Sequence, residues 1–263
     1  MNKILFNNNS ILRFLSSTVL ITMSLYCIVQ GGLILKIALS ILIFLISYEY
    51  ISITEKIDTI YLKSTKSFLN IIIFLLSIIS IKFSIIFLVI VSLLSLIQKK
   101  SFKIHKIFVL LGPIYLCFPF ILLFNIRMSD FGLDIILWFL LIVWITDIFS
   151  YIGGNYIGGK KLSLSLSPNK TWSGFICGIT CATIFSGICF YINDYTVLMG
   201  LIFGFSLALF TQFGDLFESW IKRKHLVKDS GKLIPGHGGV LDRLDGLLLS
   251  SILLYIGYLF NGM

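Results

Sequence analysis

An apolar run, Val197–Phe213 (VLMGLIFGFSLALFTQF), stands just before a polar stretch, Ser219–Asp245 (SWIKRKHLVKDSGKLIPGHGGVLDRLD), and this contrast decides the fold. The apolar run approaches the length of a membrane-spanning helix, which needs about 20 apolar residues. Similar runs make up most of the chain, since 57% of its 263 residues are hydrophobic and only 13% are charged. Soluble domains carry about 25% charged residues. The sequence therefore predicts an integral membrane protein.

The spans are predicted to be helices, which makes the fold class an all-α polytopic integral membrane protein. A segment in the bilayer must satisfy its backbone hydrogen bonds internally, and the apolar runs lack the period-2 alternation of barrel strands. Ser67–Ile97 could form one long helix, but Lys82 near its centre favours two. We expect about nine spans, at Phe14–Val29, Leu33–Ile53, Phe68–Ile81, Phe83–Ile97, Ile107–Phe124, Leu133–Ser150, Phe175–Ile192, Val197–Phe213 and Leu247–Phe260.

The basic residues set the expected orientation. With nine spans and a cytoplasmic N-terminus, most of the 21 Lys and Arg residues fall in the inner segments. The positive-inside rule favours that arrangement. Asp147, Asp215, Asp242 and Asp245 then gather at the cytoplasmic face, where nucleotides are available, and Glu49 also lies at an inner end. An active site facing the cytoplasm, in a bacterial inner (plasma) membrane, is the expected location.

Other features of the composition exclude some classes of function. The net charge of +9 comes from short loops that face anionic headgroups, so no nucleic-acid partner is expected. The five cysteines fall in apolar segments and are expected to be packing residues. The first span is expected to remain uncleaved. We expect one membrane domain over residues 1–263, with 1–130 mainly scaffold helices and 131–263 the catalytic half.

Two carboxylate pairs flank or close the polar stretch. Asp215 and Glu218 are three residues apart, and so are Asp242 and Asp245. On a helix this spacing puts both members of a pair on one face. Such carboxylates raise each other's pKa unless a cation neutralises them, and Mg²⁺ commonly takes one or two carboxylates together with phosphate and water. The pairs therefore indicate a Mg²⁺ site, with a second cation left open. A plainer interpretation, solvated pairs bridging neighbouring basic side chains, stays open too.

A glycine-rich run lies inside the polar stretch. Gly236–Gly239 has little side-chain bulk and can turn consecutive backbone N–H groups toward an anion. The nearby Lys228 and Arg243 favour a phosphate cradle over a plain turn. His237 could be a metal ligand, an acid–base group or the donor of a turn-stabilising hydrogen bond, and these alternatives stay open.

A second polar island follows the sixth expected span. Asp147 and two aromatic residues fall near the same face of the expected helix. Ser167, Lys170 and Thr171 suit anion binding ahead of the next helix, whose N-terminus adds its dipole. An interfacial anchor and a helix cap explain the same residues equally well.

The signature in the polar stretch resembles that of the phosphatidate cytidylyltransferases, the CDP-diacylglycerol synthases. Many fixed positions at fixed spacing carry the resemblance, which covers roughly the C-terminal half of the chain. They are Ser219, Lys222-Arg223, Lys228-Asp229, Gly231, Ile234, Pro235, His237-Gly238-Gly239, Val240, Asp242-Arg243, Leu244 and Asp245. The lead-in Gly214–Ser219 and the island from Asp147 to Thr171 are similar to the family as well.

The resemblance implies transfer of CMP from CTP to phosphatidic acid, giving CDP-diacylglycerol and pyrophosphate for phospholipid biosynthesis. It implies Mg²⁺ as cofactor, membrane lipids as surroundings, and leaves a homodimer open. Implied catalytic residues are Asp215, Lys222, Arg223, Lys228, Asp229, His237, Asp242, Arg243 and Asp245. Implied substrate-binding residues are Asp147, Ser167, Pro168, Lys170, Thr171, Gly238 and Gly239. The expected metal ligands are Asp215, Glu218, Asp242 and Asp245.

One departure and two rival functions accompany this interpretation. Family members often have a glutamate where this chain has Ser173, so an acidic role at that position is in doubt. Another membrane phosphotransferase would also use aspartates at the cytoplasmic face, but its differently spaced motif is not found. A transporter would place ionisable residues at mid-membrane, whereas here most charges lie at span ends.

Overall fold

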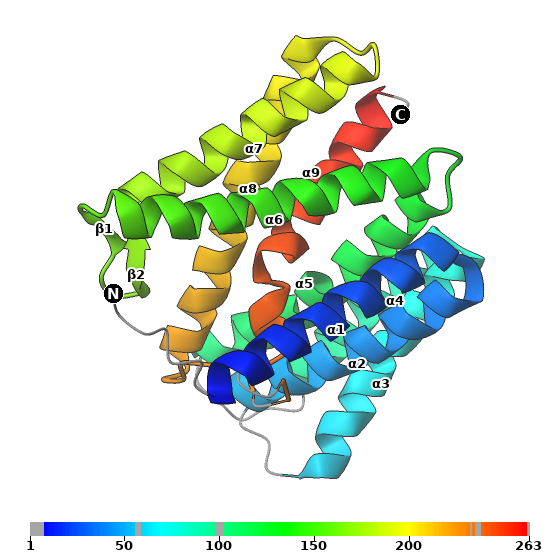
Figure 1. Cartoon of the computed structure of the whole chain (residues 1–263). Helices are drawn as coiled ribbons and strands as arrows, with labels where there is room; N and C mark the ends of the chain where they lie inside the picture. The colour runs from blue at the N-terminus through cyan, green and yellow to red at the C-terminus, as the bar shows by residue number, and fades with distance from the viewer. Residues whose placement is uncertain (1–7, 56–58, 98–102, 232, 235–237, 262–263) are drawn as a thin grey trace. The chain divides into compact units, whose positions relative to one another are not determined.

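The computed structural model describes residues 8–55, 59–97, 103–231, 233–234 and 238–261. Within these ranges the chain forms nine α-helices, one short 3-10 helix (η1) and one two-stranded sheet (Figure 1). The N-terminal helices are α1 (Asn8–Gln30), α2 (Gly32–Thr54), α3 (Ile60–Ile79), α4 (Ile81–Ile97) and α5 (Lys103–Arg127). The remainder are α6 (Gly132–Tyr156), β1 (Lys161–Ser163), β2 (Ser167–Thr171), α7 (Trp172–Ile192), α8 (Val197–Lys224), η1 (Leu241–Arg243) and α9 (Asp245–Asn261).

Each expected span corresponds to one of these helices. The division of Ser67–Ile97 into two helices is confirmed, since α3 ends at Ile79 and its C-cap residue, Ser80, has an extended backbone (φ −159°, ψ 125°). Six helices, α2, α3, α5, α6, α7 and α8, are long and apolar enough to cross a membrane, while α4 and α9 are shorter apolar helices. The fold is therefore that of an all-helical polytopic membrane protein. The short β1–β2 hairpin, antiparallel and paired from Lys161 to Thr171, was not predicted.

The chain divides into two compact units, each of which is described by itself. The first unit comprises residues 1–117 and 227–243. In it α2 packs against α1, α3 and η1, and α3 packs against α4. Ile43 and Ile46 of α2 and Ile73 and Phe74 of α3 are fully buried. Asn70 donates a hydrogen bond to the hydroxyl of Ser47 (2.9 Å) across this interface. Such interhelical hydrogen bonds are worth about 0.6 kcal/mol on average in membrane proteins.

The second unit comprises residues 118–226 and 244–263 and carries α6, α7, α8 and α9. Helix α8 packs against α6, α7 and α9. Small and hydroxyl residues allow close approach, as is usual between membrane helices. Ser186 of α7, for example, is buried and donates to the carbonyl of Gly200 of α8 (2.6 Å). These contacts position α8, whose C-terminal half carries the first carboxylate pair.

Candidate active site

Helix α8 continues beyond its apolar run through Asp215, Glu218, Lys222 and Arg223 to Lys224. The expectation that Asp215 and Glu218 share a helical face is therefore met. Glu218 is only 1% exposed, and its Oε2 accepts a hydrogen bond from Nζ of Lys222, one turn further on, at 2.8 Å. Lys222 is itself buried, so each side chain neutralises the charge of the other where little water can do so. Arg223, the next residue, is partly exposed.

Asp215 is joined to the second polar island by an ion pair. Its Oδ2 accepts from Nζ of Lys170, a residue of β2. Both side chains remain partly exposed, at 29% for Asp215 and 24% for Lys170. The β1–β2 hairpin therefore brings a basic group of the island to the carboxylate of α8. The two regions that the sequence analysis singled out separately meet here.

The start of α9 lies against the same part of α8. A Cβ built on Gly214 would stand 2.5 Å from the carbonyl oxygen of Asp245, so only glycine permits this approach. Asp245 is followed by the apolar part of α9. Loss of hydration, then the charges of Asp215 and Glu218, raise the pKa of Asp245 well above its usual range, although a hydrogen bond from the N–H of Gly246 opposes the shift. The charge of exposed Asp147 acts on Asp245 as well.

This acidic cluster (Asp147, Asp215, Glu218 and Asp245) suits a cation that also binds another anion. Within the described residues, no three His, Cys, Asp or Glu side chains form a ready metal cage. Mg²⁺ needs no such cage, because it usually takes one or two carboxylates and completes its shell with water and substrate phosphates. Within this cluster, Asp215 pairs with Lys170 and Glu218 pairs with Lys222.

The N-terminus of α7 is capped by a side-chain hydroxyl group. Thr171 is the N-cap, and its Oγ1 accepts from the N–H of Gly174 at 3.1 Å. Ser173 lies 2.9 Å from that hydroxyl and donates to the carbonyl of Gly158. Ser173 thus ties α7 to the turn after α6. Ser167 is partly exposed and Pro168 is exposed, both on β2.

The glycine-rich loop belongs to the first unit, and the structure describes its residues 227–231, 233–234 and 238–243. Asp242 of η1 accepts hydrogen bonds from the N–H groups of Ser230 (2.8 Å to Oδ2) and Gly239 (2.9 Å). Gly238 has a positive φ of 87°, a conformation that side chains rarely adopt. Its carbonyl accepts from the N–H of Ile234 at 3.0 Å. Asp242 therefore organises the loop whose backbone was expected to approach phosphate.

The structure separates some residues that the sequence had grouped. Asp242 and Asp245 were expected to share a helical face, but this is wrong, because Asp242 lies in η1 and the α-helix begins only at Asp245. Of the remaining expected site residues, Lys228, Asp229 and Arg243 are exposed on the loop. His237 lies outside the described residues.

Glu49 of α2 is the site feature that the sequence analysis underrated. It was noted only as an acidic residue at the inner end of a span. The side chain is 3% exposed and accepts hydrogen bonds from Ser230, Val240 and Leu241 of the loop. The available signal was a carboxylate inside an apolar segment, which is costly unless it has a specific task.

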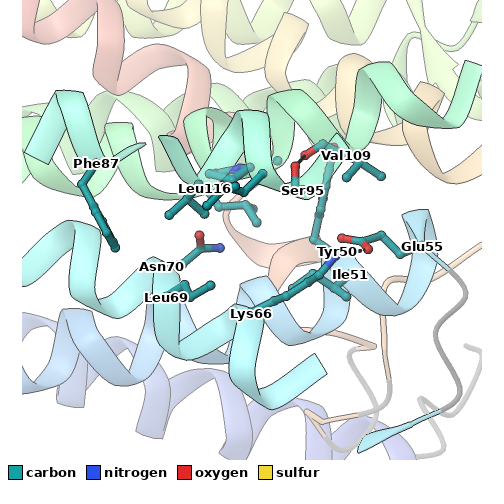
Figure 2. A pocket seen from close by; sticks show the side chains of 14 residues that line it. Tyr50, Ile51, Glu55, Lys66, Leu69, Asn70, Phe87, Ser95, Val109 and Leu116 are labelled. Carbon is teal, nitrogen blue, oxygen red and sulfur yellow. Dashed lines mark hydrogen bonds and ion pairs between the residues drawn. The ribbon is translucent and has the colours of Figure 1, made fainter. Parts of the chain in front are cut away.

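A cavity of about 250 Å³ lies elsewhere in the first unit (Figure 2). Its walls come from α2, α3, α4 and α5 and are mostly apolar, with the partly buried ion pair between Glu55 and Lys66 among the lining residues. The lining includes no residue of the glycine-rich loop or of the acidic cluster. This cavity is therefore a feature separate from the candidate active site.

Comparison with known proteins identifies relatives of similar sequence. The chain is 43% identical over 156 residues to a phosphatidate cytidylyltransferase of Rickettsia bellii, a match covering 56% of this chain and 68% of the relative. It is 43% identical over 132 residues to one of Brucella abortus biovar 1, covering 49% of this chain but only 48% of the relative. A Helicobacter pylori (strain J99) protein of the same name is 41% identical over 157 residues, covering 59% and 58% of the two chains.

A family model accounts for nearly the whole chain. The model described as the cytidylyltransferase family matches residues 11–260, which include the first-unit helices as well as the signature. The family expected from the Ser219–Asp245 signature is confirmed. The chain belongs to the cytidylyltransferase family.

Proposed function

We propose that the protein is a phosphatidate cytidylyltransferase that makes CDP-diacylglycerol. A phosphate oxygen of phosphatidic acid would attack the α-phosphorus of CTP, and the bond from that phosphorus to the bridging oxygen would break to release pyrophosphate. The observation that carries the proposal is the meeting of Asp215, Lys170 and Asp245 within a family of cytidylyltransferases. The names of the relatives support the same substrate pair.

The chemistry asks the chain mainly to position and neutralise charge. The lipid phosphate is already an anionic nucleophile, so no strong general base is needed. Phosphoryl-type transfers depend on orientation and on stabilising charge at the phosphorus and the leaving group. Lys170 and Arg223 would contact phosphate oxygens, while the exposed Lys228 and Arg243 of the glycine-rich loop would bind the rest of the triphosphate. The N–H groups around Gly238 would approach it closely because no side chain intervenes.

Mg²⁺ is the cation that fits the acidic cluster. When bound with CTP it would withdraw charge from the phosphates and so favour departure of pyrophosphate. Asp215 and Asp245 are the proposed direct ligands, with Glu218 buried beside them against Lys222. Asp242 remains a proposed ligand. Its Oδ2 accepts hydrogen bonds from the N–H groups of both Ser230 and Gly239, so it would approach the cation through Oδ1, which lies 3.1 Å from the N–H of Ser230.

The proposed orientation follows the basic residues. We place the N-terminus and the signature on the cytoplasmic side of a bacterial inner membrane, where CTP is made and phosphatidic acid is present in the leaflet. Membrane lipids are the expected surroundings, and a homodimer stays a prediction.

The function is tested with purified protein in phosphatidate-containing vesicles and CTP labelled at its α-phosphate. We expect label to enter a lipid that is extractable into chloroform, with one pyrophosphate released per lipid formed. Parallel reactions with UDP-sugars in place of CTP test the rival phosphotransferase, and solute flux without nucleotide tests a transporter. Absence of labelled lipid, or labelling from UDP-sugars instead, would contradict the proposal.

A further inference from the structure

Glu49 connects a helix of the N-terminal half to the glycine-rich loop. Its Oε1 accepts from the N–H of Val240 at 3.0 Å, and its Oε2 accepts from the N–H of Leu241 and the hydroxyl of Ser230, both at 2.9 Å. The loop residues are far from Glu49 in sequence, yet all of them belong to the same compact unit. One side chain of α2 therefore holds both limbs of the loop.

The loop is built to let this carboxylate in. A Cβ on Gly231 would stand 2.5 Å from Oε1 of Glu49. A Cβ on Gly239 would stand 1.9 Å from the hydroxyl oxygen of Ser230 and 2.5 Å from Oε2 of Glu49. Those distances are too short for any larger residue. Glu49 thus accounts for Gly231, and Glu49 together with the Ser230 hydroxyl that it binds accounts for Gly239, so these glycines need not be explained only by a close approach to phosphate.

The cost of burying a carboxylate indicates which of the two partners orders the other. A buried carboxylate is costly unless hydrogen bonds replace its hydration, and three donors from the loop do so here. If the loop moved away, Glu49 would be left buried without those donors. Apart from the loop, helix α2 packs against α1 and α3 within its unit, so we treat the carboxylate as the fixed partner and the loop as the part that it orders.

Asp242 repeats the arrangement from the other side of the loop. It accepts from the N–H of Ser230 and Gly239, the immediate neighbours of Gly231 and Val240. Ser230 is therefore bound through its N–H by Asp242 and through its hydroxyl by Glu49. A shift of the Glu49 carboxylate would therefore move Ser230, and through it Asp242, a proposed ligand, and the backbone around Gly238.

We propose that Glu49 is a positioning residue for the cytidylyl-transfer site: it orders the glycine-rich loop for the triphosphate of CTP without touching substrate. This inference rests on the proposed function. It gives α2, a helix of the half that was expected to be mainly scaffold, an indirect part in the reaction, through the loop. Misplacing groups at a site by about 1 Å can cost roughly 100-fold in rate.

The test compares Glu49→Gln with Glu55→Gln, which changes the other buried glutamate at the end of α2. Glutamine keeps the size of Glu49, but its NH₂ would face an N–H donor wherever it pointed. We expect kcat/KM for CTP to fall about 100-fold with the melting temperature close to that of Glu55→Gln. Glu49→Asp, which keeps the charge on a shorter arm, should recover part of the loss, and Glu55→Gln should stay within about twofold of the wild type, as a change away from the site does.

A second readout does not depend on turnover. Hydrogen–deuterium exchange at Val240 and Leu241 should become about tenfold faster in Glu49→Gln, because their N–H groups lose their acceptor and open locally. Unchanged exchange there, or CTP turnover within twofold of the wild type, would overturn the inference. Equal losses in Glu49→Gln and Glu55→Gln would overturn it as well, by showing a general packing role. Failure of the proposed function would instead appear as a wild-type protein without CTP-dependent lipid labelling, and the exchange measurement would still decide whether Glu49 orders the loop.

Discussion

At the scale of single residues, Lys170 is the residue of the second polar island that contacts the acidic cluster. It pairs with Asp215, and both side chains keep some access to solvent. Lys170→Met should raise KM for CTP or phosphatidate about tenfold, since a hydrogen bond to a charged group is worth about 1.5–3 kcal/mol. Steady-state kinetics with each substrate varied in turn measures the change. Lys161→Met, an exposed lysine on the neighbouring strand β1, is the control and should leave both KM values unchanged.

The buried pair of Glu218 and Lys222 predicts a stability effect. Removing one partner leaves the other charge poorly hydrated, which costs about 3–5 kcal/mol in buried pairs. Glu218→Gln should therefore lower the melting temperature in detergent clearly. The double variant Glu218→Gln/Lys222→Met removes both charges and should melt higher than Glu218→Gln. A double variant that melts lower than either single variant would show that the pair is not the source of the effect.

The helical spacing of residues close together in the sequence was predictable, but the partners of those residues were not. The spacing of Asp215 and Glu218 predicted a shared face because both lie on one regular helix. Nothing in the sequence indicated that Lys170 would pair with Asp215, or that Glu49 would accept hydrogen bonds from Val240 and Leu241. Those contacts join segments far apart in the chain, and single-sequence periodicity carries no information on such distances.

At the scale of elements, the first turn of α7 depends on Thr171. Its hydroxyl accepts the N–H of Gly174, which would otherwise be unsatisfied at the helix start. Thr171→Val keeps the shape but removes the cap, and loss of a cap costs about 1 kcal/mol. The melting temperature should fall by about 2–4 °C, as expected for a chain of this size. Thr171→Ser keeps the hydroxyl and should melt near the wild type, and equal melting of the two variants would contradict the capping role.

Element type was well predicted, and element ends less so. The apolar runs gave the positions of the helices, and Lys82 helped to locate the break at Ser80. The extension of α8 to Lys224 was not visible in hydropathy, because the added turns are polar. The break between η1 and α9 was missed because a three-residue spacing was assumed to be helical, whereas Asp242 bonds to backbone N–H groups of the loop. The β1–β2 hairpin is too short for an alternation pattern to reveal it.

At the scale of the whole molecule, the proposed orientation predicts which loops face which side of the membrane. Two exposed positions of the second unit make the comparison: Ser165 in the β1–β2 turn and Asp194 between α7 and α8. In a variant without native cysteines, Asp194→Cys should react with a membrane-impermeant maleimide in intact cells, and Ser165→Cys should react only after lysis. The reverse pattern would contradict a cytoplasmic active site, whatever the activity of the purified protein.

The most direct measurement of the central claim is the Mg²⁺ dependence of labelled-lipid formation from CTP in wild type, Asp215→Asn, Asp245→Asn and Asp134→Asn. The last variant changes an exposed aspartate in the first turn of α6 and is the control. We predict that Asp215→Asn and Asp245→Asn lose activity at least about 100-fold while remaining folded, because each removes a group that neutralises and positions the reacting phosphates. Asp134→Asn should match the wild type. Substantial Mg²⁺-dependent activity in Asp215→Asn or Asp245→Asn would contradict the claim that these carboxylates, one from α8 and one from α9, form the site of cytidylyl transfer.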